Sequence, residues 1–337
     1  MNILDPLAAS RRIASSYRRY ILSSFSPRRG DLQRELQHAL DYDFRLSKGP
    51  FLQASAPFVT GASVADLVAE GVLSTGFRRL TGTAFPVDRP LYVHQEQAIR
   101  RSVRGRNLVI ATGTGSGKTE GFLLPIVDQL LREAEAGTLA EPGVRALLLY
   151  PMNAQAKDQV KRLRTLLSDL PEITFGRYVG ETPTDDARAE ENFMVRFPGE
   201  PRLPNELLSR DRMQEAPPHI LLTNYAMLEY LLLRPADSAL FDGLKGRHWR
   251  TIVLDEAHVY NGAQGTEVAM LLRRVRDRVV RSERGRLRCF ATSATLGRGV
   301  QDYPQLVRFA SDLFDEKFDW DPDDVEQQDV IGALRKP

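Results

Sequence analysis

The chain has little cysteine and no long apolar runs. Cys289 is the single cysteine among 337 residues, which excludes an intramolecular disulfide and a cysteine-cluster metal site and suits the cytoplasm. No run of about 18 apolar residues appears, so we expect no membrane span. The N-terminus lacks the apolar stretch and small-residue cleavage site of a secretory signal. These absences predict a cytoplasmic protein without a membrane partner.

Strong net charge is also missing, but the charge is unevenly distributed. The formal net charge is +2, so the chain as a whole gives no sign of a polyanionic partner. Residues 1–34 hold seven arginines against two acids, whereas residues 311–337 hold nine acids against three bases. The N-terminal arginine pairs lie in a segment with helical spacing of apolar residues. They could contact a nucleic-acid backbone or simply form a solvated helix face.

One glycine-rich stretch, Ala111 to Thr119, stands out from an otherwise ordinary globular composition. We interpret it as a phosphate loop of the type G-x-x-x-x-G-K-[ST], with Gly113 and Gly117 as its glycines. In such a loop, backbone N–H groups approach phosphate oxygens, a lysine supplies a point charge, and a hydroxyl reaches Mg²⁺. The expected ligands of the nucleotide are Thr114, Gly115, Ser116, Gly117, Lys118 and Thr119.

The residues around this loop predict a strand before it and a helix after it. Residues 107–111 form a short apolar run, and residues 120–132 have a helical pattern, so the phosphates would meet a helix N-terminus. Upstream, Gln95 sits in a predicted helix. Its amide could recognise adenine, because an amide both donates and accepts hydrogen bonds, or it could be an ordinary surface glutamine.

Further along the chain, predicted strands and helices alternate. Buried strands are expected at residues 144–150, 219–223, 251–255 and 287–291, each followed or preceded by a helical pattern. Alternation of this kind predicts an α/β fold, with a parallel sheet and helices on both faces. Residues 181–217 are rich in proline and charge and are predicted to be a loop-rich insertion.

An acidic motif, Asp255-Glu256-Ala257-His258, follows one of these strands directly. Carboxylates at the carboxyl end of a parallel strand face the crevice in which ligands bind. We expect Asp255 to hold Mg²⁺ together with Thr119, and Glu256 to orient an attacking water. Lys118, Asp255, Glu256 and His258 are therefore the predicted catalytic residues. A surface acidic pair fits poorly, since a phosphate loop requires an acidic metal partner on a nearby strand.

In their order along the chain, these motifs resemble those of the first RecA-like domain of superfamily 2 DEAD/DEAH-box helicases. The series comprises Gln95, the phosphate loop, residues 150–155, residues 222–224, the acidic motif and Ser293-Ala294-Thr295. Residues 221–235 and 262–274 resemble a subgroup of large helicases. This subgroup contains Hrq-type and mitomycin-repair helicases and the helicases of anti-phage systems such as DISARM and Druantia.

The resemblance implies that ATP and Mg²⁺ are the cofactors and that the protein moves along nucleic acid. DNA is expected rather than RNA. The resemblance assigns contacts with the strand backbone to Pro151, Asn153, Gln155, Thr223 and Asn224. Amide and backbone donors grip phosphates without selecting a base sequence. Ser293 and Thr295 are expected to couple the nucleotide state to movement, although an ordinary turn would also account for them.

The resemblance stops short of a complete motor. We predict an N-terminal extension at residues 1–84, a RecA-like ATP-binding domain at 85–300 and an acidic tail at 301–337. A second RecA-like domain, in cis or in trans, would supply the arginine finger. The expected function is half of an ATP-dependent DNA helicase or translocase, in DNA repair or phage defence. The alternative is a nucleotide-gated nucleic-acid-binding fragment with negligible ATPase activity. A transporter-type ATPase lacks support, because no Leu-Ser-Gly-Gly signature is present.

Overall fold

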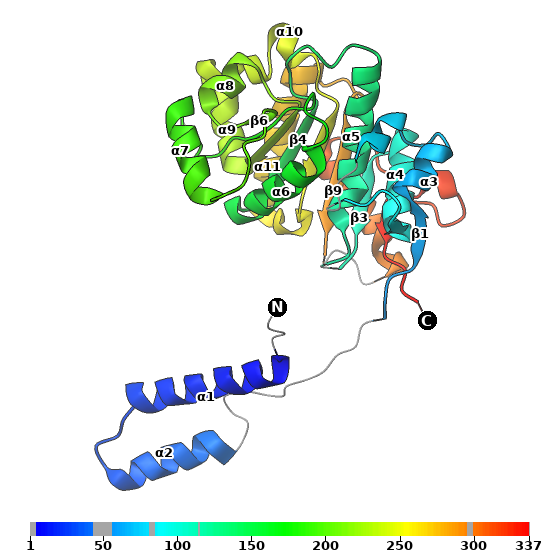
Figure 1. Ribbon diagram of the computed structural model, residues 1–337. Coiled ribbons are helices and arrows are strands. Elements are labelled where there is room, and N and C mark those ends of the chain that lie inside the picture. The colour runs from blue at the N-terminus through cyan, green and yellow to red at the C-terminus, as the bar shows by residue number, and fades with distance from the viewer. Residues whose placement is uncertain (1–4, 43–55, 81–84, 114, 295–298, 337) are drawn as a thin grey trace. The chain divides into compact units, whose positions relative to one another are not determined.

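The computed structural model describes residues 5–42, 56–80, 85–113, 115–294 and 299–336. The chain divides into two compact units, Met1–Ala56 and Pro57–Pro337, which are considered separately (Figure 1). The first unit holds two helices, α1 (Pro6–Ser24) and α2 (Gly30–Tyr42). Asp5 caps α1, since its carboxylate accepts hydrogen bonds from the backbone N–H groups of Leu7 and Ala8. The helices predicted for this segment are thus confirmed.

The second unit is built on a parallel sheet of eight strands. Their spatial order is β10-β3-β9-β8-β4-β7-β5-β6. In that order their bounds are Val330–Gly332, Leu108–Ala111, Arg288–Ser293, Thr251–Leu254, Ala146–Tyr150, Ile220–Asn224, Phe175–Arg177 and Glu206–Leu207. Every pairing within this sheet is parallel. The predicted α/β fold is confirmed.

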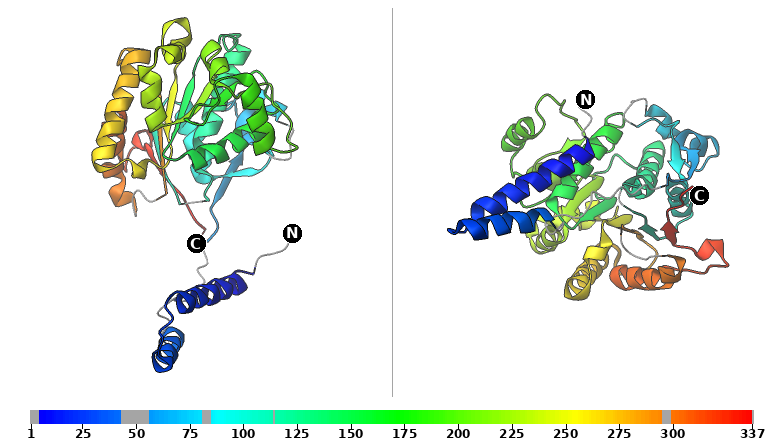
Figure 2. Two further views of the ribbon diagram at one scale, coloured as in Figure 1. Left: turned by 90° about the vertical axis from the view of Figure 1, so that its left-hand side faces the viewer. Right: turned by 90° about the horizontal axis from the view of Figure 1, so that it is seen from below.

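Helices cover both faces of this sheet, and each face has its own core (Figures 1 and 2). Along β3, Leu108 and Ile110 pack into one core and Val109 into the other, as the two-residue period of a strand requires. A strand buried on both faces reads as a continuous apolar run. The first core contains side chains of α3 (Val64–Ala69), α4 (Val93–Val103), α5 (Lys118–Glu135) and α6 (Asn153–Leu167), and the second contains those of α9 (Tyr225–Leu233), α11 (Gly262–Val280) and α12 (Tyr303–Phe314).

The segment before the phosphate loop is more regular than its many glycines and prolines suggest. Two short strands, β1 (Thr60–Ser63) and β2 (Pro90–Tyr92), pair antiparallel. Between them lie α3 and a 3₁₀ helix at Thr75–Arg79. Ser63 caps α3, because Ser63 and Asp66 form a reciprocal capping box. This arrangement fixes the start of α4, which carries Gln95.

The acidic C-terminal segment adds an edge strand to the sheet, which the sequence pattern did not reveal. β10 pairs with β3, the strand that leads into the phosphate loop. Arg106 donates to both carboxylate oxygens of Asp329, at 2.7 Å each, and to Asp319 at 3.1 Å. The strand predicted at 287–291 is present as β9, and β10 follows it in the chain. Arg106, in the α4–β3 connection, offsets the acidic charge of the C-terminal segment and so allows it to pair with β3.

The region predicted to be a loop-rich insertion contains three elements. They are α7 (Asp186–Arg196), the two-residue strand β6 and α8 (Arg210–Glu215). The remaining short elements of the second unit are 3₁₀ helices at Pro235–Leu240, Ala257–Val259, Val300–Asp302 and Val325–Gln327, and α10 (Gly243–Gly246). In the part of the chain that the structure describes, every helix is too short or too polar to cross a membrane.

Candidate active site

The phosphate loop connects β3 to α5 at the carboxyl edge of the sheet. Gly115 and Gly117 have φ values of 74° and 72°, which side-chain-bearing residues rarely adopt. Gly117 is also the N-cap of α5, so the first turn of this helix directs its free N–H groups toward the loop. Thr114 lies outside the described residues. The arrangement is that of an anion-binding loop at a helix N-terminus.

One detail of the predicted loop is wrong. Counted back from Gly117, the first position of the pattern G-x-x-x-x-G-K-[ST] is Thr112, not Gly113. The buried hydroxyls of Thr112 and Ser116 lie 2.6 Å apart and share a hydrogen bond. This bond closes the base of the loop across four residues. The hydroxyl of Thr112 therefore contributes directly to the shape of the loop.

Gln95 supports the phosphate loop from outside. Its amide oxygen accepts from the backbone N–H of Tyr92 at 2.8 Å, and its amide nitrogen donates to the carbonyl oxygen of Gly117 at 2.9 Å. Because both ends of the amide are engaged within the protein, the structure places Gln95 as a brace for the loop. Adenine recognition by this side chain would require these bonds to be shared or exchanged.

His94 braces the adjacent residue of the loop. Its Nε2 lies 2.8 Å from the carbonyl oxygen of Ser116, and the ring is almost completely buried beside the aromatic rings of Phe58 and Tyr92. Burial lowers the pKa of His94. A neutral ring that donates through Nε2–H fits this geometry. The sequence interpretation did not include His94, although it directly precedes Gln95.

The acidic motif and the phosphate loop meet at Lys118 and Glu256. Lys118 Nζ lies 3.2 Å from Glu256 Oε1, although 138 residues separate them in the chain. Both side chains are largely buried. Glu256 has a φ of 51°, an uncommon backbone conformation for a non-glycine residue. The two motifs that the sequence predicted to converge are thus within hydrogen-bonding distance.

Asp255 is held by a residue that the sequence interpretation missed. The hydroxyl of Thr292 donates to Asp255 Oδ1, and the same hydroxyl oxygen accepts from the backbone N–H of Glu256 at 3.2 Å. Asp255 is 9% exposed, and burial raises the pKa of its carboxyl group. β8 and β9 are adjacent parallel strands, which brings Thr292 beside the acidic motif. In the sequence, Thr292 directly precedes the predicted motif Ser293-Ala294-Thr295, and this position could have identified it as a site residue.

His258 links the acidic motif to the residues that follow β9. Its Nδ1 lies 3.3 Å from Glu256 Oε2 and 3.1 Å from Ser293 Oγ. Thr295, the other predicted coupling residue, lies outside the described residues. Ser293 therefore reaches the acidic motif through His258, and its role in coupling stays a prediction.

The side chains available to a divalent cation are few. Within the described ranges there is no group of three or more His, Cys, Asp or Glu side chains that could hold a metal ion. Thr119, near the start of α5, is buried, and its hydroxyl lies 3.4 Å from the amide nitrogen of Gln159. One hydroxyl and one carboxylate suit Mg²⁺, which keeps several waters and usually takes further ligands from bound phosphates.

The predicted nucleic-acid residues lie at the same carboxyl edge, but they are not equally accessible. In the β4–β7 register, Tyr150 pairs with Asn224, so Pro151 lies near the end of β7. Asn224 caps α9 by accepting from the N–H of Met227 at 2.7 Å. Thr223 is fully buried and its hydroxyl donates to the carbonyl oxygen of Tyr178, so its side chain is not placed to contact a strand. The side chains of Asn153 and Gln155 lie outside the described part.

Comparison with known proteins shows a consistent set of relatives. The model of the DEAD/DEAH box helicase family matches residues 92–303. The chain is 31% identical over 388 aligned residues to the Druantia protein DruE of Escherichia coli (strain UMEA 4076-1), an alignment that covers 89% of this chain and 21% of DruE. It is 30% identical to the ATP-dependent helicase hrq1 of Schizosaccharomyces pombe, over 64% of this chain and 17% of that protein.

A solved structure shares the fold. The DUF1998 helicase MrfA, whose crystal structure was determined bound to DNA, matches with a TM-score of 0.54 at 23% identity, covering 77% of this chain and 30% of MrfA. The chain thus spans about a fifth of the length of the curated relatives it matches. The motif resemblance to superfamily 2 helicases, including the Hrq-type and defence subgroup, is confirmed.

Proposed function

The chain belongs to the DEAD/DEAH box helicase family, and from this premise we propose that it is the ATP-binding half of an ATP-dependent DNA helicase or translocase. The observation that carries the proposal is the approach of Lys118 Nζ to Glu256 Oε1 at 3.2 Å. A phosphate-binding lysine and a water-orienting carboxylate must both reach the terminal phosphate of one nucleotide. Residues 118 and 256 come from different elements that only the folded sheet brings together.

The roles of the individual residues follow from their positions. The N–H groups of Gly115, Ser116 and Gly117 and the charge of Lys118 would hold the phosphates, with Thr114 as a neighbour. Thr119 and Asp255 would hold Mg²⁺, which supplies neutralisation of the charge that develops during phosphoryl transfer. The open loop fits a polyphosphate, since a Cβ atom at Gly113 or Gly115 would meet no heavy atom within 4 Å.

Glu256 is the residue that we assign to the attacking water. Its carboxylate lies between Lys118 and His258, at 3.2 Å and 3.3 Å respectively. The bond to Lys118 holds Oε1 beside the phosphate loop, whereas the buried Oε2 makes no hydrogen bond among the described residues and would be the oxygen that accepts from the attacking water. His258 and Ser293 would transmit the position of this carboxylate to the segment after β9, together with Thr295.

We propose DNA as the nucleic acid that this domain binds. Pro151 and Asn224 lie at the carboxyl ends of β4 and β7, and Asn153 and Gln155 lie in the first turn of α6. The fold is shared with a helicase determined bound to DNA, at 23% identity, and with one determined bound to single-stranded RNA, at 18% identity. In this assignment Thr223 supports the adjacent loop through its bond to Tyr178. The biological setting that we propose is DNA repair or phage defence, because the chain is similar to the Druantia protein DruE and its motifs resemble those of Hrq-type and mitomycin-repair helicases.

A complete motor also needs a second RecA-like domain, in cis or in trans. Such a domain supplies an arginine finger that raises phosphoryl-transfer rates by about 10³–10⁵-fold in related enzymes. The relatives, which are several times longer than this chain, offer room for it. The alternative of a nucleotide-gated binding fragment is not favoured by this set of helicase relatives.

Nucleotide turnover tests the proposal. We expect the chain by itself to hydrolyse ATP slowly, and a polypeptide that joins it to the second domain to be stimulated by DNA. Phosphate release should be measured with and without single-stranded and duplex DNA. Glu256→Gln should abolish the stimulated turnover and preserve ATP binding. Absence of DNA stimulation in the joined protein would contradict the proposal.

A further inference from the structure

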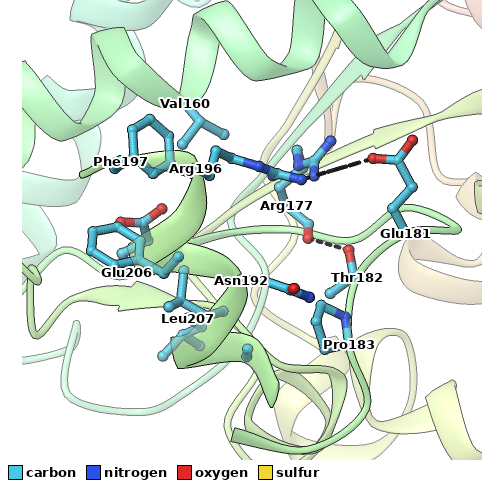
Figure 3. Close-up of a pocket in the computed structure, with 13 residues that line it drawn as sticks. Val160, Arg177, Glu181, Thr182, Pro183, Asn192, Arg196, Phe197, Glu206 and Leu207 are labelled. Carbon is cyan, nitrogen blue, oxygen red and sulfur yellow. Dashed lines mark hydrogen bonds and ion pairs between the residues drawn. The ribbon is translucent and has the colours of Figure 1, made fainter. Parts of the chain in front are cut away.

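A small pocket lies beside β5, away from the phosphate loop. It is lined by residues of α6, β5, β6 and α7 and by the segment that follows β5, and it encloses a cavity of about 60 Å³ (Figure 3). This is far smaller than a site for a drug-sized ligand, which takes roughly 300–1,000 Å³. A group of a few heavy atoms, such as a phosphate, suits its size.

Two guanidinium groups meet in this pocket. Arg177, the last residue of β5, and Arg196, the last residue of α7, each place one Nη2 near the same oxygen, Glu181 Oε2, at 3.8 and 3.9 Å. These distances exceed the 2.7–3.2 Å of an ordinary N–H···O hydrogen bond. Figure 3 shows Glu181 at the rim, extending toward the two arginines. One loosely held carboxylate therefore faces two positive charges.

Arg177 is the group that requires an explanation. Its side chain is only 11% exposed, and among the described residues its guanidinium donates no hydrogen bond. Burial and the neighbouring charge of Arg196 lower the pKa of Arg177. A guanidinium has five N–H donors, and the contact of Arg177 with Glu181 at 3.8 Å is too long for a hydrogen bond, so these donors are left to the solvent that enters the pocket. The other carboxylate of the lining, Glu206, is already paired with Arg164.

We propose that Arg177 and Arg196 form a binding site for a backbone phosphate of the nucleic-acid strand, and that Glu181 occupies the place of this phosphate when no strand is bound. Two guanidiniums directed at one oxygen suit a phosphate, which offers several acceptor oxygens in place of one distant carboxylate oxygen. The 63% exposure of the Glu181 side chain allows it to move out into solvent.

The location of the pocket identifies the nucleic acid as the source of the phosphate. Arg177 pairs in register with Leu222, and the N–H of Tyr178 donates to the carbonyl oxygen of Leu222 at 2.8 Å. Arg177 thus lies one strand spacing, about 5 Å, from Leu222, which is two residues before the end of β7. Asn224 lies at that end, so a strand crossing the ends of β4 and β7 would continue toward Arg177. The inference rests on the proposed function and adds a contact formed partly by α7.

The experiment measures DNA affinity against salt. A fluorescein-labelled oligothymidylate of about 20 nucleotides is titrated with the full chain at roughly 50 to 200 mM salt. We expect Arg196→Gln to raise Kd about fivefold at the low-salt end and to reduce the slope of log K against log salt by about 0.7, the loss of one phosphate contact. Glu181→Gln should lower Kd, because it removes the competing carboxylate.

Arg188→Gln is the matched control. Arg188 lies on α7 and is exposed, does not line the pocket, and its replacement causes the same change in net charge. Its Kd and salt slope should stay within about twofold and 0.2 of the unsubstituted protein. Equal effects of Arg188→Gln and Arg196→Gln would overturn the inference. Arg196 is the better target than Arg177 because its side chain is 34% exposed, which makes a folding defect avoidable.

The remaining outcomes separate the inference from the proposed function. Failure of the unsubstituted chain to bind the oligonucleotide would refute both. Binding with an unchanged salt slope in Arg196→Gln would overturn the inference alone. Inorganic phosphate, titrated separately by calorimetry, tests the other source: if it binds the unsubstituted chain but Arg196→Gln leaves DNA affinity unchanged, the pocket takes a free anion and the assignment to nucleic acid is wrong.

Discussion

The hydroxyl group of Thr292 connects the two acidic residues of the candidate site. It donates to the Asp255 carboxylate and accepts from the Glu256 N–H. Thr292→Val keeps the shape of the side chain but removes the hydroxyl that bonds the Asp255 carboxylate and the Glu256 N–H. We expect a loss of about 1–3 kcal/mol in the free energy of unfolding and weaker binding of Mg²⁺ with ATP.

The matched variant is Thr292→Ser, which retains the hydroxyl and removes one buried methyl group. Its loss should be smaller, about 0.5–1.5 kcal/mol, with nucleotide binding preserved. Urea unfolding and calorimetry compare the two. Equal losses for valine and serine would show that packing, and not the hydroxyl, determines the contribution of Thr292.

A second single-residue prediction concerns pH. Burial and the nearby charge of Arg145 lower the pKa of His219 to about 4, and its Nδ1 accepts from the N–H of Thr174 at 3.1 Å. Because this pKa lies below the value of 6.5 expected for the unfolded chain, the stabilisation is complete above pH 6.5. It is lost as the pH falls toward 4, by up to about 3 kcal/mol.

The variant His219→Gln removes this titration. Its unfolding free energy, measured with urea at several pH values between about 4 and 7, should depend on pH less steeply than that of the unsubstituted protein. Parallel pH profiles would mean that His219 titrates alike in the folded and unfolded chains, contrary to its burial.

For single residues, sequence patterns predicted which residues belong to the candidate site better than they predicted the contacts that each residue makes. Lys118, Asp255 and Glu256 follow from motif spacing, because their chemistry requires particular side chains at particular places. The bracing by Gln95, the burial of Thr223 and the bonds of Thr292 depend on which strands are neighbours. That information is not contained in local spacing.

Among the elements, the edge strand β10 depends most on a single arginine. Arg106 pairs with Asp329, whose side chain is only 2% exposed. Arg106→Ala would leave this carboxylate buried without its cation, and we expect a loss of about 3–5 kcal/mol in the free energy of unfolding. The exposed pair of Arg104 and Glu326 provides a control. Arg104→Ala should cost at most about 1 kcal/mol.

Urea denaturation measures both variants. Equally small effects of the Arg106 and Arg104 substitutions would show that Arg106 does not stabilise β10. β10 was missed in the sequence because it has three residues within an acidic segment, whereas β4, β7 and β8 were found because they are longer apolar runs buried on both faces. Short edge strands are selected by their tertiary partners, here β3 and Arg106.

For the whole molecule, the alternation of elements was sufficient to predict a parallel sheet with helices on both faces. It could not give the strand order, in which β3 and β9 are neighbours although nearly two hundred residues separate them. That order brings the phosphate loop, the acidic motif and Ser293 to one edge. The proposed function depends on this convergence.

The most direct test of this convergence is calorimetric titration of the chain with ATP in the presence of Mg²⁺. We expect the unsubstituted protein and Glu256→Gln to bind ATP, whereas Lys118→Ala, folded to the same melting temperature within a few degrees, should give no binding heat. Undiminished ATP binding by Lys118→Ala would contradict the assignment of the phosphate loop, and with it the proposed motor.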